Sequence, residues 1–103
     1  MNRIEMLKDL LTQDPNNQLA RYGLGMEYSG KGDVDSAVAE FKKLVEINPD
    51  YANAYFMAAQ ALAKAERADE AKQLLRQGIT AAARTGNHHA QSEMQGLLDE
   101  LEF

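Results

Sequence analysis

The sequence predicts an all-α fold of six short helices in one domain, and three observations support this prediction. Apolar residues recur three and four positions apart in successive segments, which is the spacing of one helix face. Proline, glycine and asparagine separate these segments, as expected where helices end. The pattern of one pair of segments recurs 34 residues later, which indicates helix pairs stacked as a solenoid.

Length and composition indicate one globular domain covering residues 1–103. Sixteen acidic and eleven basic residues give a net charge of −5, so the protein repels phosphate backbones and we expect no nucleic-acid partner. Because cysteine is absent, disulfides and thiolate chemistry are excluded. No apolar run is long enough for a signal peptide or a membrane span, so we expect a cytoplasmic protein that does not contact membranes.

Residues 1–14 are predicted to form an N-terminal half-repeat consisting of one helix. The apolar residues on its inner face are Ile4, Leu7, Leu10 and Leu11. Pro15 ends this helix, because proline lacks an amide donor and disfavours helix in the residue before it. A short helix with one apolar face is unstable alone, so it should pack on the next helix.

Residues 18–51 are predicted to form the first complete helix pair. The second helix starts near Asn17 and ends in the glycine-rich segment 29–32, where glycine supplies a left-handed turn. Asp35 is expected to cap the third helix, which runs to about Ile47 before Pro49 closes the unit. The inward residues of this third helix are Ala37, Phe41, Leu44 and Val45.

Residues 52–85 repeat the plan, and residues 87–102 add a C-terminal capping helix. The fourth helix carries Tyr55, Ala58, Ala59 and Leu62 on one face. After a turn at residues 66–68, Asp69 is expected to open a fifth helix that Gly86 ends, with Ala71, Leu75 and Ile79 inside. The sixth helix has the apolar stripe Met94, Leu97, Leu98 and Leu101 and an outer face of Gln91, Gln95 and Asp99, which suits a solubilising cap.

The repeating positions carry a family resemblance. A shift of 34 residues superimposes Leu24, Gly25, Tyr28, Ala37 and Phe41 on Ala58, Ala59, Leu62, Ala71 and Leu75, and Pro49 on Pro15 in the other direction. Residues 18–51, and more loosely 52–83, therefore resemble tetratricopeptide repeats. The resemblance implies a right-handed superhelix of antiparallel helix pairs, in which small residues allow close approach and larger ones fill the remaining space. Arg21 departs from the family pattern, which usually has a large apolar residue there, and we expect it at a wet edge beside the short half-repeat.

The same resemblance implies a concave groove lined by the first helix of each pair. Its rows here would be Leu19, Tyr22, Met26, Asn53, Phe56 and Gln60, with His89 and Ser92 as an extension. We predict that this groove binds a peptide or helix of a partner protein, and Tyr22, Met26 and Phe56 are the leading contacts. In the alternative interpretation these three side chains only pack inside the molecule. The basic clamp that some family members use for a chaperone tail is missing from these rows.

Two further function classes are weighed against this prediction. Self-association through the apolar groove or the end faces would give a homodimer or a stacked array. An enzyme would need a nucleophile with a base and an orienting group, and the sequence shows none. Residues 25–32 lack the final hydroxyl of a phosphate-binding loop, and the adjacent His88 and His89 point apart on a helix. We therefore predict no catalysis, no cofactor and no metal.

Overall fold

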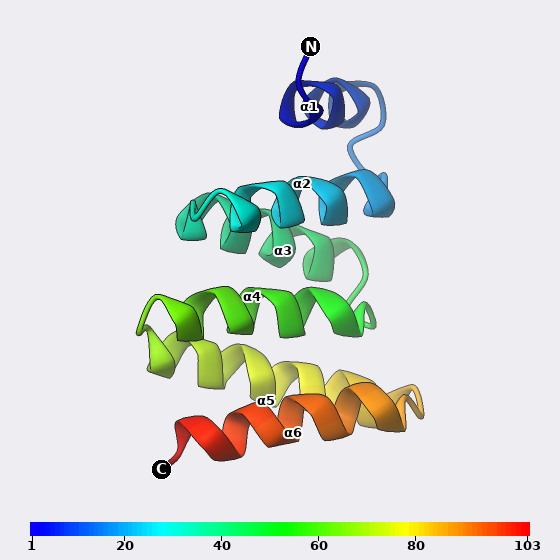
Figure 1. The fold of residues 1–103 in the computed structure, drawn as a ribbon. Coiled ribbons are helices and arrows are strands. Elements are labelled where there is room, and N and C mark those ends of the chain that lie inside the picture. The colour runs from blue at the N-terminus through cyan, green and yellow to red at the C-terminus, as the bar shows by residue number, and fades with distance from the viewer.

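The computed structural model describes residues 1–103 and contains six α-helices and no strands, which confirms the predicted all-α fold. The helices are α1 (Arg3–Gln13), α2 (Gln18–Gly30), α3 (Val34–Ile47), α4 (Ala52–Lys64), α5 (Ala68–Arg84) and α6 (His88–Leu101). They stack in sequence order into a slab of 43 × 29 × 18 Å, with α1 and α6 at opposite ends (Figure 1). Each helix packs on the next, and α4 also contacts both α2 and α6.

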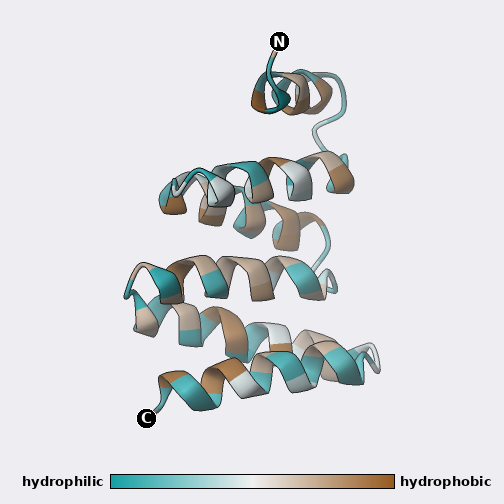
Figure 2. Cartoon of the chain, viewed as in Figure 1, coloured by the Kyte–Doolittle hydropathy of each residue, from teal (hydrophilic) through white to brown (hydrophobic).

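The hydrophobic core is divided unequally between the two ends of the stack. A cluster of 18 buried residues joins α3, α4, α5 and α6, and its largest fully buried side chains are Phe41, Leu44, Leu62, Leu75 and Met94. A second cluster of only four buried residues, Leu7, Leu11, Ala20 and Leu24, joins α1 to α2. Along each helix the hydropathy alternates between apolar and polar residues (Figure 2). Because α1 contacts no helix except α2, it is the most weakly held element.

Local signals set the helix boundaries. The side chains of Asn2, Asn17, Asp33 and Asn87 each accept a hydrogen bond from a backbone N–H in the first turn of a helix. Gly32, in the turn between α2 and α3, and Gly86, in the turn between α5 and α6, adopt positive φ angles of 79° and 71°. Glycine tolerates this left-handed conformation best. Glu66 takes the corresponding place between α4 and α5, with φ of 61°.

Four expectations about individual residues are corrected by the structure. Asp33, not Asp35, caps α3, because the positive φ of Gly32 places the start of the helix two residues earlier. The fifth helix begins at Ala68, so Asp69 lies in its first turn. Leu10 is 46% exposed, since no helix covers that side of α1.

Arg21 is the fourth correction. It is 9% exposed and lies in the interior, not at a wet edge. Its Nη1 pairs with Glu40 at 3.1 Å, and its Nη2 donates a hydrogen bond of 2.9 Å to the carbonyl oxygen of Pro15. The two polar partners make the burial of this guanidinium possible.

Candidate protein-binding groove

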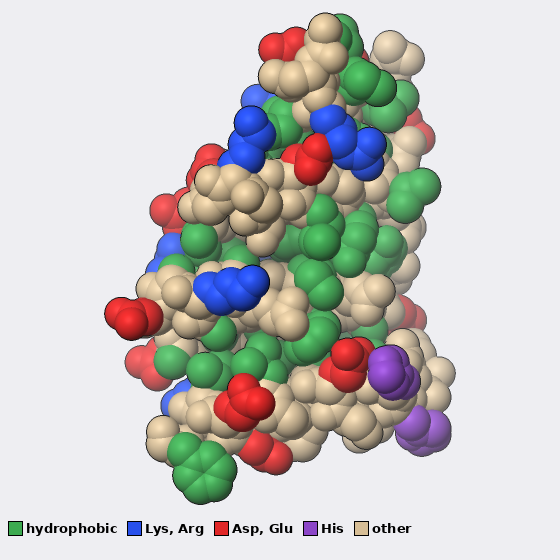
Figure 3. All heavy atoms as spheres, in the orientation of Figure 1, with side chains coloured by type: hydrophobic (Ala, Val, Ile, Leu, Met, Phe, Trp, Pro, Cys, Tyr) green, Lys and Arg blue, Asp and Glu red, His purple; other side chains and the backbone are tan.

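The candidate groove is the face formed by α2, α4 and α6. Hydrophobic side chains gather on this face between α2 and α6 (Figure 3). Of the six side chains that we expect here, Leu19 and Met26 are 77% and 39% exposed, and Asn53 is also exposed. Tyr22, Phe56 and Gln60 are half-buried, so each presents part of its surface to solvent. An exposed leucine and methionine beside half-buried aromatic rings can contact a partner segment through apolar surface.

The residues expected at the repeat-packing positions are mostly buried. Leu24, Ala37, Phe41, Ala59, Leu62, Ala71 and Leu75 are each at most 2% exposed. Gly25 is buried as well, and a Cβ atom built there would lie 2.6 Å from Cε1 of Phe41, so only glycine fits without movement. Tyr28 is half-buried and Pro49 is exposed at the α3–α4 turn. These residues position the helices that carry the groove side chains.

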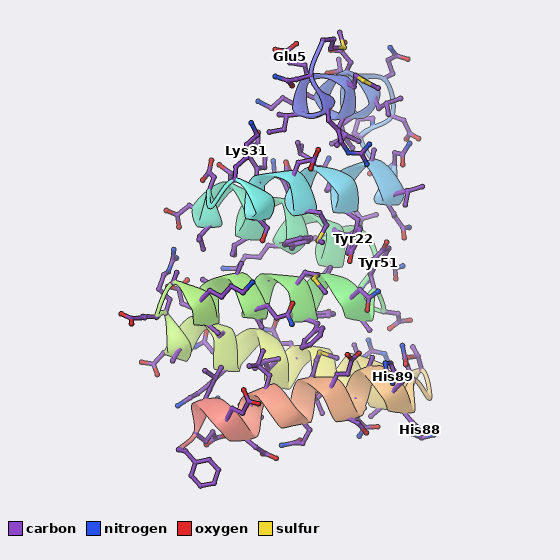
Figure 4. The ribbon with its side chains drawn as sticks, in the orientation of Figure 1. Glu5, Tyr22, Lys31, Tyr51, His88 and His89 are labelled. Carbon is purple, nitrogen blue, oxygen red and sulfur yellow. The ribbon has the colours of Figure 1, made fainter.

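Tyr22 links the groove to the core. Its ring centroid lies 5.9 Å from that of Phe41 and 5.6 Å from that of Tyr51, and Figure 4 shows Tyr22 and Tyr51 side by side between α2 and α4. Such tilted aromatic pairs stabilise the arrangement beyond the burial of area alone. Burial, together with the nearby Tyr51, raises the pKa of the Tyr22 hydroxyl, so the ring stays neutral at ordinary pH. Sequence reasoning missed Tyr51, although an aromatic residue just after Pro49 could have indicated it.

A pocket of about 430 Å³ lies between α1 and α2 at the N-terminal end of this face. It brings together three expected groove residues, Leu19, Tyr22 and Met26, but none from α4. The remaining lining residues were not expected at a site: Arg3, Leu7, Leu10, Asn17, Ala20, Gly23 and Glu27. Arg3 Nε and Glu27 Oε1 form an ion pair of 3.1 Å beside the apolar walls.

Other features of the surface fit no metal site or membrane span. No group of three or more histidine, aspartate or glutamate side chains converges, and His88 and His89 lie at the exposed start of α6, where His89 meets Glu93 at 3.2 Å (Figure 4). None of the six helices combines the length and the apolar character needed to cross a membrane.

Comparison with known proteins decides the family. A family model described as tetratricopeptide repeat matches residues 28–99, which is more than half of the chain. The chain belongs to the tetratricopeptide repeat family. Proteins of this family generally mediate protein–protein interactions.

Similarity to other proteins extends over nearly the whole chain. The TPR repeat-containing protein PA0015 of Pseudomonas aeruginosa is 32% identical over 99 residues, covering 96% of this chain and 94% of the relative. The solution structure of protein BPP2914 from Bordetella parapertussis has a TM-score of 0.82 and 25% identity, covering 99% of this chain and 89% of that one. The TPR2B domain of yeast Sti1, solved in complex with pHsp70, has a TM-score of 0.87 at 17% identity, covering 96% and 79% respectively, and shows the fold alone. These similarities extend over α1, which precedes the residues that the family model matches.

Proposed function

We propose that this tetratricopeptide repeat protein is a non-catalytic scaffold that holds a peptide or helix of a partner protein against the face of α2 and α4. The observation that carries the proposal is the exposure of Leu19 and Met26, 77% and 39%, on the face where Tyr22 and Phe56 are half-buried. Apolar side chains of this size cost free energy when they face water, and a partner segment that covers them recovers it.

The chemistry of the face narrows the kind of partner. Asn53 and Gln60 are the polar residues among the six, and none of the six carries a charge. A carboxylate-terminated tail would find no cation there, so the fitting partner is an apolar or mixed segment, such as one face of an amphipathic helix. Its polar backbone or side-chain groups can pair with the two amides.

A charge placed at Phe56 tests this proposal. Phe56→Glu should abolish partner capture while the circular dichroism of the helices stays unchanged, because a carboxylate cannot be buried against an apolar segment. Gln77→Glu is the matched control, since it adds the same charge on the exposed side of α5. Quantitative mass spectrometry of proteins retained from the native host compares both variants with the wild type. Equal retention by Phe56→Glu and the wild type would reject the groove assignment.

Self-association is the second candidate, and one observation favours it. Five of the six large hydrophobic residues that are exposed, Met1, Met6, Leu10, Leu19 and Met26, belong to the N-terminal third of the chain, and only Phe103 does not. Two copies meeting through these ends would form a homodimer with an isologous interface. Light scattering over a hundredfold concentration range, about micromolar to 0.1 mM, separates the candidates, since a constant monomer mass rules this one out.

A further inference from the structure

The pocket between α1 and α2, termed here the N-terminal slot, is lined by Leu7, Leu10, Tyr22, Gly23 and Met26. Adding 34 to these numbers gives the same positions of the next repeat, namely Phe41, Leu44, Phe56, Met57 and Gln60. Those residues belong to α3 and α4, and both helices pack on α2. The molecule therefore contains the same two-helix wall twice, and the second wall is covered by α2.

The exposed fractions of equivalent residues show how much apolar surface the covering helix buries. Leu10 is 46% exposed, whereas Leu44, its equivalent, is 0% exposed. Leu7 is 8% exposed and Phe41 is 1% exposed. The wall of the N-terminal slot thus presents apolar surface that its counterpart buries, and the helix stack ends there without the polar outer face of a cap.

We propose that the N-terminal slot binds one amphipathic α-helix of a partner protein, lying antiparallel to α1 as α2 lies against α3. This helix would take the position of the first helix of the repeat whose second helix is α1, and it would continue the existing packing between successive helices. The proposal rests on the proposed function, because the slot shares Tyr22 and Met26 with the groove, and it adds a docking position between α1 and α2 for a helical segment.

Size complementarity inside the chain predicts one residue of the bound helix. In repeat 1, Gly25 meets Phe41, and a Cβ there would be 2.6 Å from the ring. At the same two positions of repeat 2, Ala59 is paired with Leu75, and both are fully buried. The larger residue is thus paired with the smaller one at each step. Because α1 has Leu7 at this position, the partner helix should present alanine to it.

Charge predicts the orientation of the bound helix. Arg3 occupies the position of Ala37, near the start of α1, and its side chain is 67% exposed. Its Nε pairs with Glu27 at 3.1 Å, and its two Nη groups make no hydrogen bond within the molecule, so they can donate to acceptors of a bound helix. A helix antiparallel to α1 brings its C-terminal turn to this end, where its free carbonyl groups and negative dipole end favour a cation.

The chain supplies its own probe, a capped synthetic peptide of residues 51–66. This segment contains α4, which already presents Ala59 to a leucine, and its high alanine content favours helix in isolation. In a titration followed by ¹H–¹⁵N correlation spectra, the full-length protein should show shifts at Leu10, Gly23 and Met26. Leu10→Glu should weaken binding by about tenfold or more, since it places a charge on the apolar wall. A peptide with Ala59→Leu should bind about tenfold more weakly, because the added carbon atoms collide with Leu7.

The controls separate this proposal from the proposed function. Leu10→Gln removes the apolar contact without a charge and is the second variant if Leu10→Glu unfolds. Gln77→Glu, on the exposed side of α5, should leave peptide affinity within about twofold of the wild type. If Phe56→Glu abolishes peptide binding and both Leu10 variants do not, the slot proposal fails and the groove stands. The slot proposal also fails if the peptide does not bind, or if it binds the wild type and the Leu10 variants equally. Self-association that Leu10→Glu removes and the peptide does not inhibit would instead assign the slot to a second copy, which contradicts the proposal.

Discussion

Repeat 1, formed by α2 and α3, and repeat 2, formed by α4 and α5, use different side chains at the same interior positions. Arg21 and Glu40 form a buried ion pair in repeat 1, whereas the equivalent residues of repeat 2 are Tyr55 and Leu74. Arg21 nevertheless donates to the carbonyl oxygen of Pro15 at 2.9 Å, as the Tyr55 hydroxyl donates to that of Pro49 at 2.8 Å. The position therefore requires a donor to a prolyl carbonyl, and either a guanidinium or a phenol meets this requirement.

The two repeats also differ in how their helices begin. In repeat 1, Asn17 and Asp33 cap α2 and α3 through side-chain hydrogen bonds. The equivalent residues of repeat 2, Tyr51 and Arg67, make no such bond. Tyr51 instead stacks on Tyr22, and Arg67 pairs with Glu70 and with Asp35 of α3. Repeat 1 is specified more by local signals, and repeat 2 depends more on contacts with its neighbour.

The largest expected effect comes from breaking the ion pair of repeat 1. Glu40→Leu should lower the free energy of unfolding by about 3 kcal/mol, because it leaves a buried guanidinium without its carboxylate partner. Arg21→Tyr combined with Glu40→Leu, which copies repeat 2, should restore stability to within about 1 kcal/mol of the wild type. Urea denaturation followed by circular dichroism measures both. A Glu40→Leu protein as stable as the wild type would show that the pair contributes nothing.

Exchanging the size-matched pair should have the next largest effect. Gly25→Ala places a Cβ atom 2.6, 2.7 and 2.9 Å from three ring atoms of Phe41, so we expect a loss of about 1–3 kcal/mol. Phe41→Leu in the same chain reproduces the Ala59–Leu75 pair of repeat 2 and should recover most of that loss. Urea unfolding of both single variants and the double variant gives their coupling energy. Strictly additive losses would contradict size matching between the two positions.

Substitutions of the turn residue with positive φ should have a smaller effect on stability, and the effect should have opposite signs in the two repeats. Gly32 and Glu66 occupy equivalent positions with φ of 79° and 61°. Glu66→Gly should stabilise the protein by about 0.5–1 kcal/mol, because only glycine adopts this conformation without steric cost. Gly32→Ala should cost about 1 kcal/mol, and the strain is purely of the backbone because nothing lies within 4 Å of the added Cβ. Thermal unfolding measured side by side tests the signs.

The sequence predicts much of the fold because its determinants are local. Segment breaks at Pro15, Gly32 and Pro49 depend on single-residue backbone preferences, and helix faces follow from spacing. The Arg21–Glu40 pair could not be predicted in this way, because its residues are 19 positions apart and meet only when α2 packs on α3. Leu10 was placed inside because spacing identifies an apolar face but does not say whether another helix covers it. Of the candidate site, the resemblance to tetratricopeptide repeats predicted Leu19, Tyr22 and Met26, but the pocket walls from α1 depend on where the stack ends.

The smallest expected effect is a pH dependence confined to repeat 2. Hydrogen bonds from Arg67 hold the pKa of the Glu70 carboxyl below its usual range, and the same contact raises the pKa of Arg67. Because the folded state favours the carboxylate, the pair stabilises the protein above the unfolded pKa of about 4.3, and this contribution is lost as pH falls through the lower folded value. The Glu70→Gln variant should therefore be slightly less stable than the wild type at pH 7. Between about pH 5 and 3 its free energy of unfolding should fall less than that of the wild type.

Repeat 1 supplies the comparison for this effect, since Ser36 stands at the position of Glu70. Glu46→Gln, which removes an exposed carboxylate that forms no ion pair, is the matched control and should follow the wild-type pH profile. Urea midpoints at pH 7, 5, 4 and 3 in low salt measure all three proteins, because added salt screens exposed charges. If Glu70→Gln and the wild type lose stability in parallel as pH falls, Arg67 contributes to repeat 2 through its contact with Asp35 alone.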